Sequence, residues 1–170
     1  MKKILALTVA LLLCVTLFTA CGGDSKLTVE KGKLHMATNA AFPPYEMTND
    51  KGGFEGIDVE VATKIAEKLD LELVVDDMDF NSVIAAVQTG KSDIAMAGLT
   101  VNEERKKNVD FTDSYATGKQ VIIVVEGSPI KTADDLFADG AKYVAGTQEA
   151  TTGNIYCSDD LGEDRTVAYT

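Results

Sequence analysis

From residue 33 onward, the chain alternates short runs rich in β-branched residues with longer runs of helical periodicity. This alternation is typical of an α/β domain, in which helices connect the parallel strands of one sheet. The sequence therefore predicts a largely parallel sheet with helices packed on it, and the 120–125 run is apolar enough to be buried on both faces. The expected strands are residues 34–38, 71–77, 93–97, 109–111, 120–125, 142–147 and 165–170.

Local signals predict the ends of the helices. Asp58 is a suitable N-cap for a helix whose Val61, Ile65 and Leu69 recur every fourth residue on one face. Thr100 begins a Thr-x-x-Glu capping box, which predicts a short helix over residues 102–108. Further expectations are caps at Asn81 and Thr132, a helix end at Gly90, a helix start at 148–156, a turn at 49–53, and a loop at 39–47, where Pro43 and Pro44 cannot donate to a ladder.

The first 20 residues have the pattern of a secretory signal, because Lys2 and Lys3 precede an apolar run that ends on small residues. An uncleaved anchor helix is the alternative, but the run is shorter than the ~20 apolar residues that a membrane core requires. The segment 18–21 resembles the lipobox of bacterial lipoproteins, which predicts a lipid anchor on Cys21 and a tether over residues 21–32. An ordinary cleaved signal with a chance cysteine is the other interpretation.

The chain is strongly acidic, with 16 basic and 27 acidic side chains and a net charge of −11. Loss of Lys2 and Lys3 with the signal would leave 14 basic side chains and a net charge of −13. Nucleic acid is therefore an unfavourable partner, and the acidity is expected to serve solubility. Removal of Cys14 and lipidation of Cys21 would leave Cys157 alone, so no internal disulfide is expected.

The character of the sequence changes at residues 114–120, where small and polar side chains lead into the apolar 120–125 run. We place a boundary here, between a first lobe over residues 33–118 and a partial second lobe over residues 119–170. One or two strands and two helices cannot bury their own sheet well. The second lobe is therefore expected to belong to a fragment or to be unusually small.

Four loops that follow expected strands form a candidate site. Ligands of open α/β sheets bind outside the carboxyl ends of the strands, so the site would combine residues 39–42, 78–82, 97–105 and 148–154. Arg105, one of two arginines in the chain, offers a planar fork that matches a carboxylate. Gly98 allows a ligand to approach the backbone closely, and the Thr100 hydroxyl can donate to the same carboxylate.

Aromatic and small residues complete this candidate site. Phe42 and Phe80 can enclose the aliphatic part of a small ligand. Thr151, Thr152 and Gly153 offer hydroxyl and N–H groups at a helix start, where an anion is favoured. Each feature also has a simpler explanation, namely a helix cap, two core aromatics and a solvated charge, and only their combination favours a binding site.

Together these stretches resemble the extracellular solute-binding proteins of ABC transporters for polar amino acids, of the glutamine- and histidine-binding type. The resemblance implies a two-lobe Venus-flytrap fold like that of periplasmic binding proteins, of the family 3 type. The first lobe would be nearly complete and the second incomplete. The matching stretches run from Met36 to Tyr156 and comprise residues 37–47, 53–69, 78–100, 104–115 and 146–156.

The same resemblance implies roles for individual residues. Arg105 would clamp the α-carboxylate of an amino acid, helped by Thr100 and the backbone at Thr152. Gly98 and Thr100 would receive the α-ammonium, two phenyl rings would flank the side chain, and Asn39 and Gln148 would select it. The implied ligand-binding residues are Asn39, Phe42, Phe80, Gly98, Thr100, Arg105, Gln148, Thr151 and Thr152.

Three departures from the family pattern affect these expectations. Ala150 stands where relatives often have glycine, and Asn39 stands where relatives that take cationic ligands often have an acid. The second departure argues against arginine or lysine as the ligand. The family's second lobe also continues well beyond the position of Thr170. Because this would remove polar partners, we expect the 170-residue chain to bind far more weakly than micromolar.

The sequence therefore predicts a monomeric, lipid-anchored protein on the extracellular or periplasmic side of the cell membrane, which delivers a polar or small neutral amino acid to an ABC transporter permease. No cofactor and no catalytic residue are expected. No metal site is expected either, because the spacing of the acidic clusters at 48–53 and 74–80 fits no metal cage. Two alternatives stay open. One is a dehydratase-like enzyme on the same fold, with Glu46 or Glu149, both expected at the surface, as general acid. The other is a sensor that binds without delivery.

Overall fold

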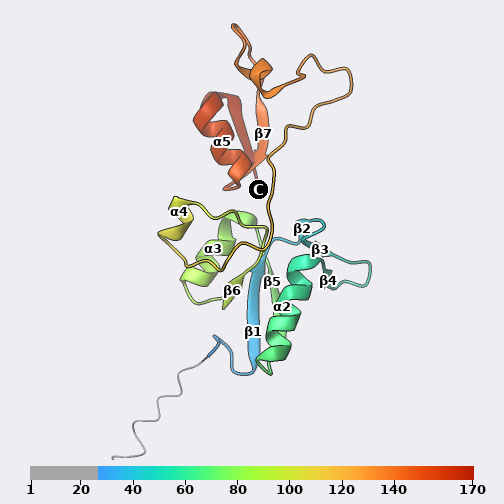
Figure 1. The fold of residues 1–170 in the computed structure, drawn as a ribbon, viewed down its shortest axis with the longest axis vertical. Coiled ribbons are helices and arrows are strands. Elements are labelled where there is room, and N and C mark those ends of the chain that lie inside the picture. Colours follow the sequence, from blue (N-terminus) through green and yellow to red (C-terminus); the bar gives the residue numbers. More distant parts are fainter. Residues whose placement is uncertain (1–26) are drawn as a thin grey trace, which may run out of the picture.

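The computed structural model describes residues 27–170 and shows two α/β bodies joined by one extended segment (Figure 1). We call the bodies the first lobe, from β1 to α4, and the second lobe, from η1 to β8. The expected signal, the Cys21 anchor and most of the tether lie outside the described residues. The extended segment, residues 109–125, contains no helix or strand and is called the crossover segment.

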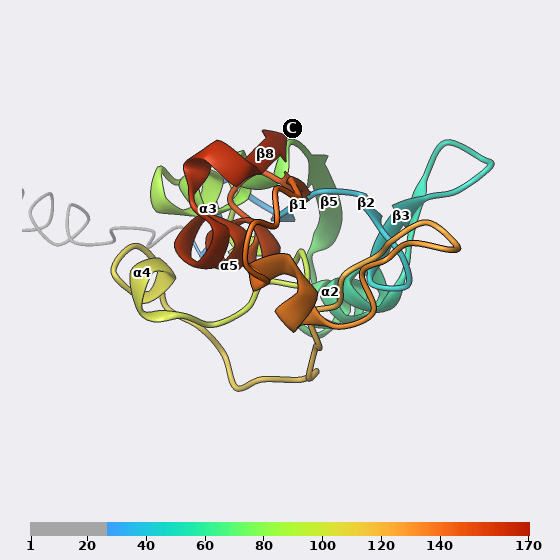
Figure 2. The same cartoon turned by 90° about the horizontal axis from the view of Figure 1, so that it is seen from above.

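The first lobe is built on a parallel three-stranded sheet. Strand β1 (Lys33–Thr38) lies between β5 (Glu72–Asp77) and β6 (Ile94–Ala95), as the alternating pattern predicts. Met36 packs with residues of α2 (Ile57–Lys68), and Ala37 packs with residues of α3 (Phe80–Gln88). Because successive residues of a strand point to opposite faces, the two helices cover opposite faces of the sheet (Figures 1 and 2).

Helix α2 packs through a different face from the one its apolar spacing indicates. Val59, Ala62 and Ala66 are buried, whereas Val61, Ile65 and Leu69 keep 38, 38 and 45% of their surface exposed. The physical reason is size, because two alanines allow the helix axis to approach the sheet closely. The larger side chains one position away are left on the outer side.

The start of α2 also differs from expectation. Gly56 is the N-cap residue, and Asp58 lies inside the first turn, fully buried. Gly56 has φ of 126°, and a Cβ there would lie 2.3 Å from the Tyr45 carbonyl oxygen. Only glycine fits such a close contact, so the helix begins where the backbone meets Tyr45, and Asp58 is free for another role.

A small antiparallel sheet replaces the expected loop at residues 39–47. It consists of β2 (Ala41–Phe42), β3 (Glu46–Thr48) and β4 (Phe54–Glu55), and it lies beside α2 (Figure 2). Pro43 and Pro44 occupy the turn between β2 and β3, where no ladder hydrogen bond is required of them. The prolines therefore restrict the position of the strands but do not prevent them.

Two other helix starts are shifted from the predicted caps. Asp79, rather than Asn81, is the N-cap residue of α3. The end of this helix is as predicted, because Gly90 follows it with φ of 70°. Asn102, rather than Thr100, caps α4 (Glu103–Lys106), and its side chain accepts a hydrogen bond from the Arg105 N–H.

The second lobe has a two-stranded parallel sheet of β7 (Ala145–Gln148) and β8 (Thr166–Tyr169). Helix α5 (Thr152–Leu161) and the 3₁₀ helices η1 (Ala133–Phe137) and η2 (Glu163–Arg165) complete it, and Thr132 is the N-cap residue of η1, as predicted. The strands expected at 109–111 and 120–125 do not form. Ile123 is 90% exposed, since no neighbouring strand among residues 27–170 pairs with this apolar run.

Candidate functional site

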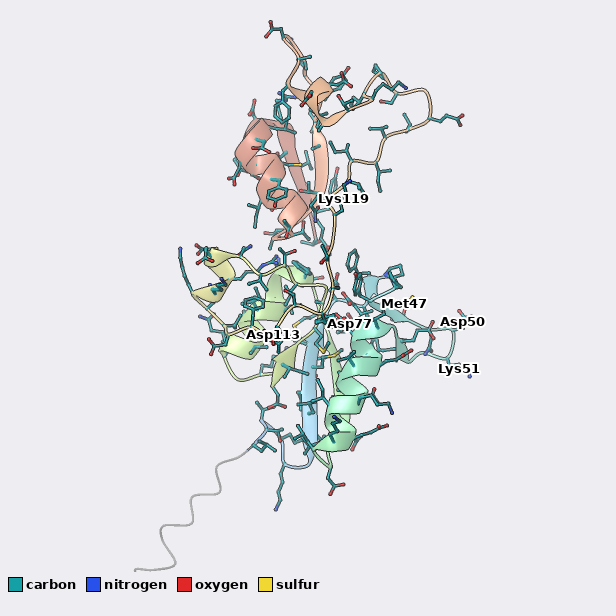
Figure 3. The ribbon with its side chains drawn as sticks, in the orientation of Figure 1. Met47, Asp50, Lys51, Asp77, Asp113 and Lys119 are labelled. Carbon is teal, nitrogen blue, oxygen red and sulfur yellow. The ribbon has the colours of Figure 1, made fainter. Side chains whose placement is uncertain are left out.

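The carboxyl ends of the first-lobe strands face the loop that follows β7. Asp77, labelled in Figure 3, is the last residue of β5 and lies at this junction of the lobes. Gln148 Nε2 donates to Asn39 Oδ1 at 3.0 Å, and Asn81 Nδ2 donates to Glu149 Oε2 at 2.9 Å. Two of the loops predicted to form the site, 39–42 and 148–154, therefore meet at the junction through an amide pair.

Arg105 makes the third contact between the lobes. Its Nη1 donates to the Thr100 carbonyl oxygen at 2.8 Å, and its Nη2 donates to the Ala150 carbonyl oxygen at 2.9 Å. The guanidinium carbon lies 5.5 Å from the centre of the Phe80 ring, and only 6% of the residue is exposed. Burial lowers the pKa of the guanidinium, but the ordinary value is so high that the group stays charged. A buried cation is thus fixed at the junction, with its fork directed at oxygen acceptors.

Phe42 and Gly98 form a second part of the candidate site. Gly98 has φ of 56°, and a Cβ there would lie 2.8 Å from Phe42 Cε1. The Phe42 ring, half exposed, also stacks on Tyr45 at 5.5 Å between ring centres. The ring therefore lies on the backbone of the loop that leads to Thr100, and glycine is required there by both conformation and contact.

The start of α5 presents backbone donors. Thr151 is the N-cap residue, and its hydroxyl accepts from Asn154 N and donates to the Gln148 carbonyl oxygen. Within residues 27–170, the N–H groups of Thr152 and Gly153 donate to no protein partner. These free donors at a helix start suit an anion.

The structure thus brings together only some of the predicted residues. Asn39 meets Gln148, and Arg105 meets Phe80 and the backbone of Thr100. The Thr100 hydroxyl, in contrast, makes no hydrogen bond with the part of the protein that the structure describes. The two phenylalanines contact different partners, Phe42 with Gly98 and Phe80 with Arg105, so an aromatic sandwich stays a prediction.

Two acids lie in a different environment from the one that the sequence predicts: Asp58 was expected to cap a helix, and Glu46 was expected at the surface as a possible general acid. Asp58 accepts hydrogen bonds from Gly98 N at 3.2 Å and from Tyr115 Oη at 2.8 Å. Glu46, expected at the surface, is only 1% exposed. Its pKa is raised to about 9, mainly by burial and secondly by the neighbouring Asp58. Alternation along 45–48 groups Glu46 with Thr48 on a polar face and so predicts an exposed Glu46, and an aspartate near a helix start is indistinguishable from a cap. Glu149 is exposed, as expected.

The described part of the chain offers no cluster of three or more histidine, cysteine or acidic side chains that could hold a metal. Cys157 is a partly buried free thiol. Among the helices of residues 27–170, none is both long and apolar enough to span a bilayer.

Two α/β lobes whose facing loops present a fixed guanidinium and free helix-start donors define a two-lobe solute-binding protein. The sequence comparison agrees, since residues 34–156 match the profile of bacterial extracellular solute-binding proteins, family 3. The chain belongs to this family.

Individual relatives are similar in both sequence and structure. The arginine-binding extracellular protein ArtP of Bacillus subtilis (strain 168) is 41% identical over 138 residues, which cover 80% of this chain and 53% of ArtP. A probable histidine-binding protein of Neisseria gonorrhoeae is 33% identical, with coverage of 96 and 61%. The arginine-bound form of truncated ArgBP from T. maritima has a TM-score of 0.75 at 36% identity, with coverage of 83 and 65%. The chain thus spans less than two thirds of each of these relatives.

Proposed function

We propose that the protein binds a free amino acid with a polar or small neutral side chain between its lobes and delivers it to an ABC transporter permease. The observation that carries the proposal is the Arg105 guanidinium, which is buried at the junction and directed at oxygen acceptors from both lobes. An α-carboxylate would replace one neutral carbonyl with two charged oxygens. Charge-assisted, bidentate pairing is stronger than the bonds it replaces.

The proposed orientation of the ligand follows from the remaining donors and acceptors. The N–H groups of Thr152 and Gly153 would complete the carboxylate site. The Asn39–Gln148 amide pair would meet the ligand side chain, and neutral amides complement neutral polar groups through both donors and acceptors. Relatives named for arginine, histidine, glutamine and cystine support amino acids as the ligand class.

Delivery to a permease and attachment to the membrane complete the proposal. We place the lipid anchor on Cys21 and the binding lobes on the extracellular or periplasmic side, in keeping with the family to which the chain belongs. A dehydratase would require a general acid at the junction. The exposed candidate there, Glu149, binds Asn81 through its carboxylate, so the geometry favours binding over catalysis.

Ligand titrations followed by the NMR signals of the protein would test this function, because they detect affinities down to millimolar. The panel comprises glutamine, histidine, arginine and cystine, each compared with its α-carboxamide. We expect the acids to bind and each carboxamide to lose at least about tenfold in affinity, because the amide cannot pair with the guanidinium as a charged partner. Equal affinities for acid and amide, or no response to any amino acid, would refute the proposal. Arginine binding more than tenfold tighter than glutamine would refute its neutral-side-chain part.

A further inference from the structure

Two carboxyl groups lie buried side by side beneath the loop that carries Gly98. Glu46 is 1% exposed and Asp58 is 0% exposed. Their proximity is imposed by the backbone, because the Asp58 N–H donates to the Tyr45 carbonyl oxygen at 2.9 Å and the Ile57 N–H donates to the Pro44 carbonyl oxygen at 3.0 Å. The first turn of α2 is thereby docked onto the start of β3. The two acids therefore cannot separate without breaking this contact.

The Asp58 carboxylate joins two parts of the protein that are far apart in sequence. Oδ2 accepts from the Gly98 N–H, and Oδ1 accepts from the Tyr115 hydroxyl. Gly98 belongs to the proposed ligand loop, whereas Tyr115 belongs to the crossover segment between the lobes. One buried carboxylate thus connects the binding loop to the segment about which the lobes would move.

Glu46 can supply a further hydrogen-bond donor to the Asp58 carboxylate. Glu46 Oε2 has no hydrogen-bond partner among residues 27–170, and no lysine, arginine or histidine there forms an ion pair with either acid. A second negative charge beside Asp58 would be uncompensated. Burial, and then Asp58, raise the pKa of Glu46 to about 9, so at neutral pH it is an O–H donor, and Asp58 has acceptor capacity for a third bond.

The other titratable groups that face the pair are tyrosines. Burial, and then the hydrogen bond to Asp58, raise the pKa of Tyr115, which therefore remains a donor throughout the range in which Glu46 titrates. Tyr45 lies close enough to raise the pKa of Tyr115 further. Tyr115 therefore adds no negative charge beside the pair while Glu46 titrates.

A closed set of contacts links this pair to the proposed site. Phe42 is the cross-strand partner of Glu46 in the β2–β3 ladder. The Phe42 ring contacts Gly98, and Asp58 holds the Gly98 N–H. Any movement of the acid pair would shift the aromatic ring and the loop backbone together.

We propose that Glu46, as a neutral acid that donates to Asp58, is a positioning residue for amino-acid binding, because it fixes the carboxylate that holds Gly98 and Tyr115. The inference rests on the proposed function and on the expectation from the sequence that Phe42 and Gly98 contact the ligand. Glu46 itself acts only through Asp58. When Glu46 loses its proton, repulsion between the two carboxylates loosens the loop, and affinity falls.

Affinity measured against pH tests this role with three variants. Glu46→Gln keeps a neutral donor, Glu46→Leu removes it, and Glu55→Gln alters an exposed acid of the neighbouring strand as a matched control. The ammonium of the ligand titrates near the same pH, so the quantity compared is the ratio of variant to wild-type affinity at each pH.

At pH 7.5 we expect Glu46→Gln to bind within threefold of wild type and Glu46→Leu at least tenfold more weakly. At pH 10 the affinity of Glu46→Gln should be about tenfold higher than that of wild type, because wild type has then lost the charge-assisted bond from Glu46 to Asp58. The control should follow wild type throughout. A constant ratio for Glu46→Gln, or wild-type affinity in Glu46→Leu, would overturn the proposal.

A second measurement needs neither ligand nor the leucine variant. Carbon-detected NMR of the ligand-free protein follows the Glu46 carboxyl carbon, which is assigned by its loss in Glu46→Gln, and the nitrogen of Gly98. We expect the Gly98 signal to move with the Glu46 titration above pH 7 and to stay fixed in Glu46→Gln. A Glu46 titration below pH 6, or a Gly98 signal that ignores it, would overturn the positioning role. A Gly98 signal that responds in a protein that binds no amino acid would support positioning and refute the proposed function.

Discussion

Arg105 Nη2 donates to the Ala150 carbonyl oxygen at 2.9 Å, and this bond joins the two lobes. Ala150 adopts φ of 60°, a conformation that residues other than glycine rarely take. The cation that we assign to the ligand carboxylate is therefore paired with a backbone oxygen of the opposite lobe. A carbonyl carries only a partial charge, so a carboxylate is expected to displace it.

Replacement of Arg105 by alanine is the most direct test of the site. We expect Arg105→Ala to weaken amino-acid binding by more than about 2 kcal/mol, or about thirtyfold, because both charge-assisted bonds are lost. Arg105→Lys should retain the charge without the fork and lose about tenfold. Lys106→Ala, which removes an exposed cation paired with Glu103, is the matched control and should leave binding unchanged. Wild-type affinity in Arg105→Ala, measured by titration calorimetry or NMR, would remove Arg105 from the site.

Gly98 can be tested against a glycine with the same backbone conformation but no neighbours. Gly98→Ala would place a Cβ 2.8 Å from the Phe42 ring, whereas Gly90, with φ of 70°, has no heavy atom within 4 Å of such a Cβ. Both variants should lose about 1–2 kcal/mol of unfolding free energy, because a left-handed conformation is strained in alanine. Only Gly98→Ala should also lose affinity, by about tenfold, since the ring or the loop has to shift. Similar affinities in the two variants would show that the Phe42–Gly98 contact is unimportant for binding.

The strain at Ala150 predicts a stabilising substitution. Ala150→Gly should leave the unfolding free energy unchanged or raise it by up to about 1 kcal/mol, because the relief of a left-handed conformation outweighs the added freedom of the unfolded chain. Ala168→Gly, at an exposed position in β8, should lower it by about 0.5–1 kcal/mol. Urea denaturation of both variants measures the difference, and an equal loss in both would contradict the predicted strain.

The sequence alone was sufficient for the central strands β1 and β5, because both are runs of strand length that contain several apolar residues and are bounded by turn residues. It failed for the face of α2. Val61 and Ala62 both fit an apolar face, and the choice between them depends on how closely the helix approaches the sheet. Such a distance is a tertiary property that spacing does not contain.

The candidate site shows the same division. Arg105 and Gly98 were placed in the predicted site only because they occur in combination with the other loops, and their role in binding stays a prediction. The burial of Asp58 and Glu46 was not predicted, because it depends on the backbone contact that docks the first turn of α2 onto the start of β3. The apolar run at 120–125 has the composition of a strand, but a strand also requires a partner, and none among residues 27–170 pairs with it.

His35 makes stability depend on pH. Burial alone would lower the pKa of this imidazole, but hydrogen bonds of Nδ1 with Asp76 at 3.0 Å and of Nε2 with Glu30 at 3.3 Å outweigh burial and raise it. Because the folded pKa lies above the unfolded value of about 6.5, the contribution to stability is complete below pH 6.5 and is lost as pH rises through the folded pKa. We expect wild type to lose more unfolding free energy than His35→Gln between pH 6 and pH 8.5, as measured by urea denaturation.

The comparison with His35→Gln cancels the pH dependence from Glu46, which both proteins share. His35 is the single histidine of the chain, so its ring signals give its pKa directly by NMR. A folded pKa below 6.5, or parallel pH profiles for the two proteins, would show that the carboxylates beside His35 do not stabilise its charged form.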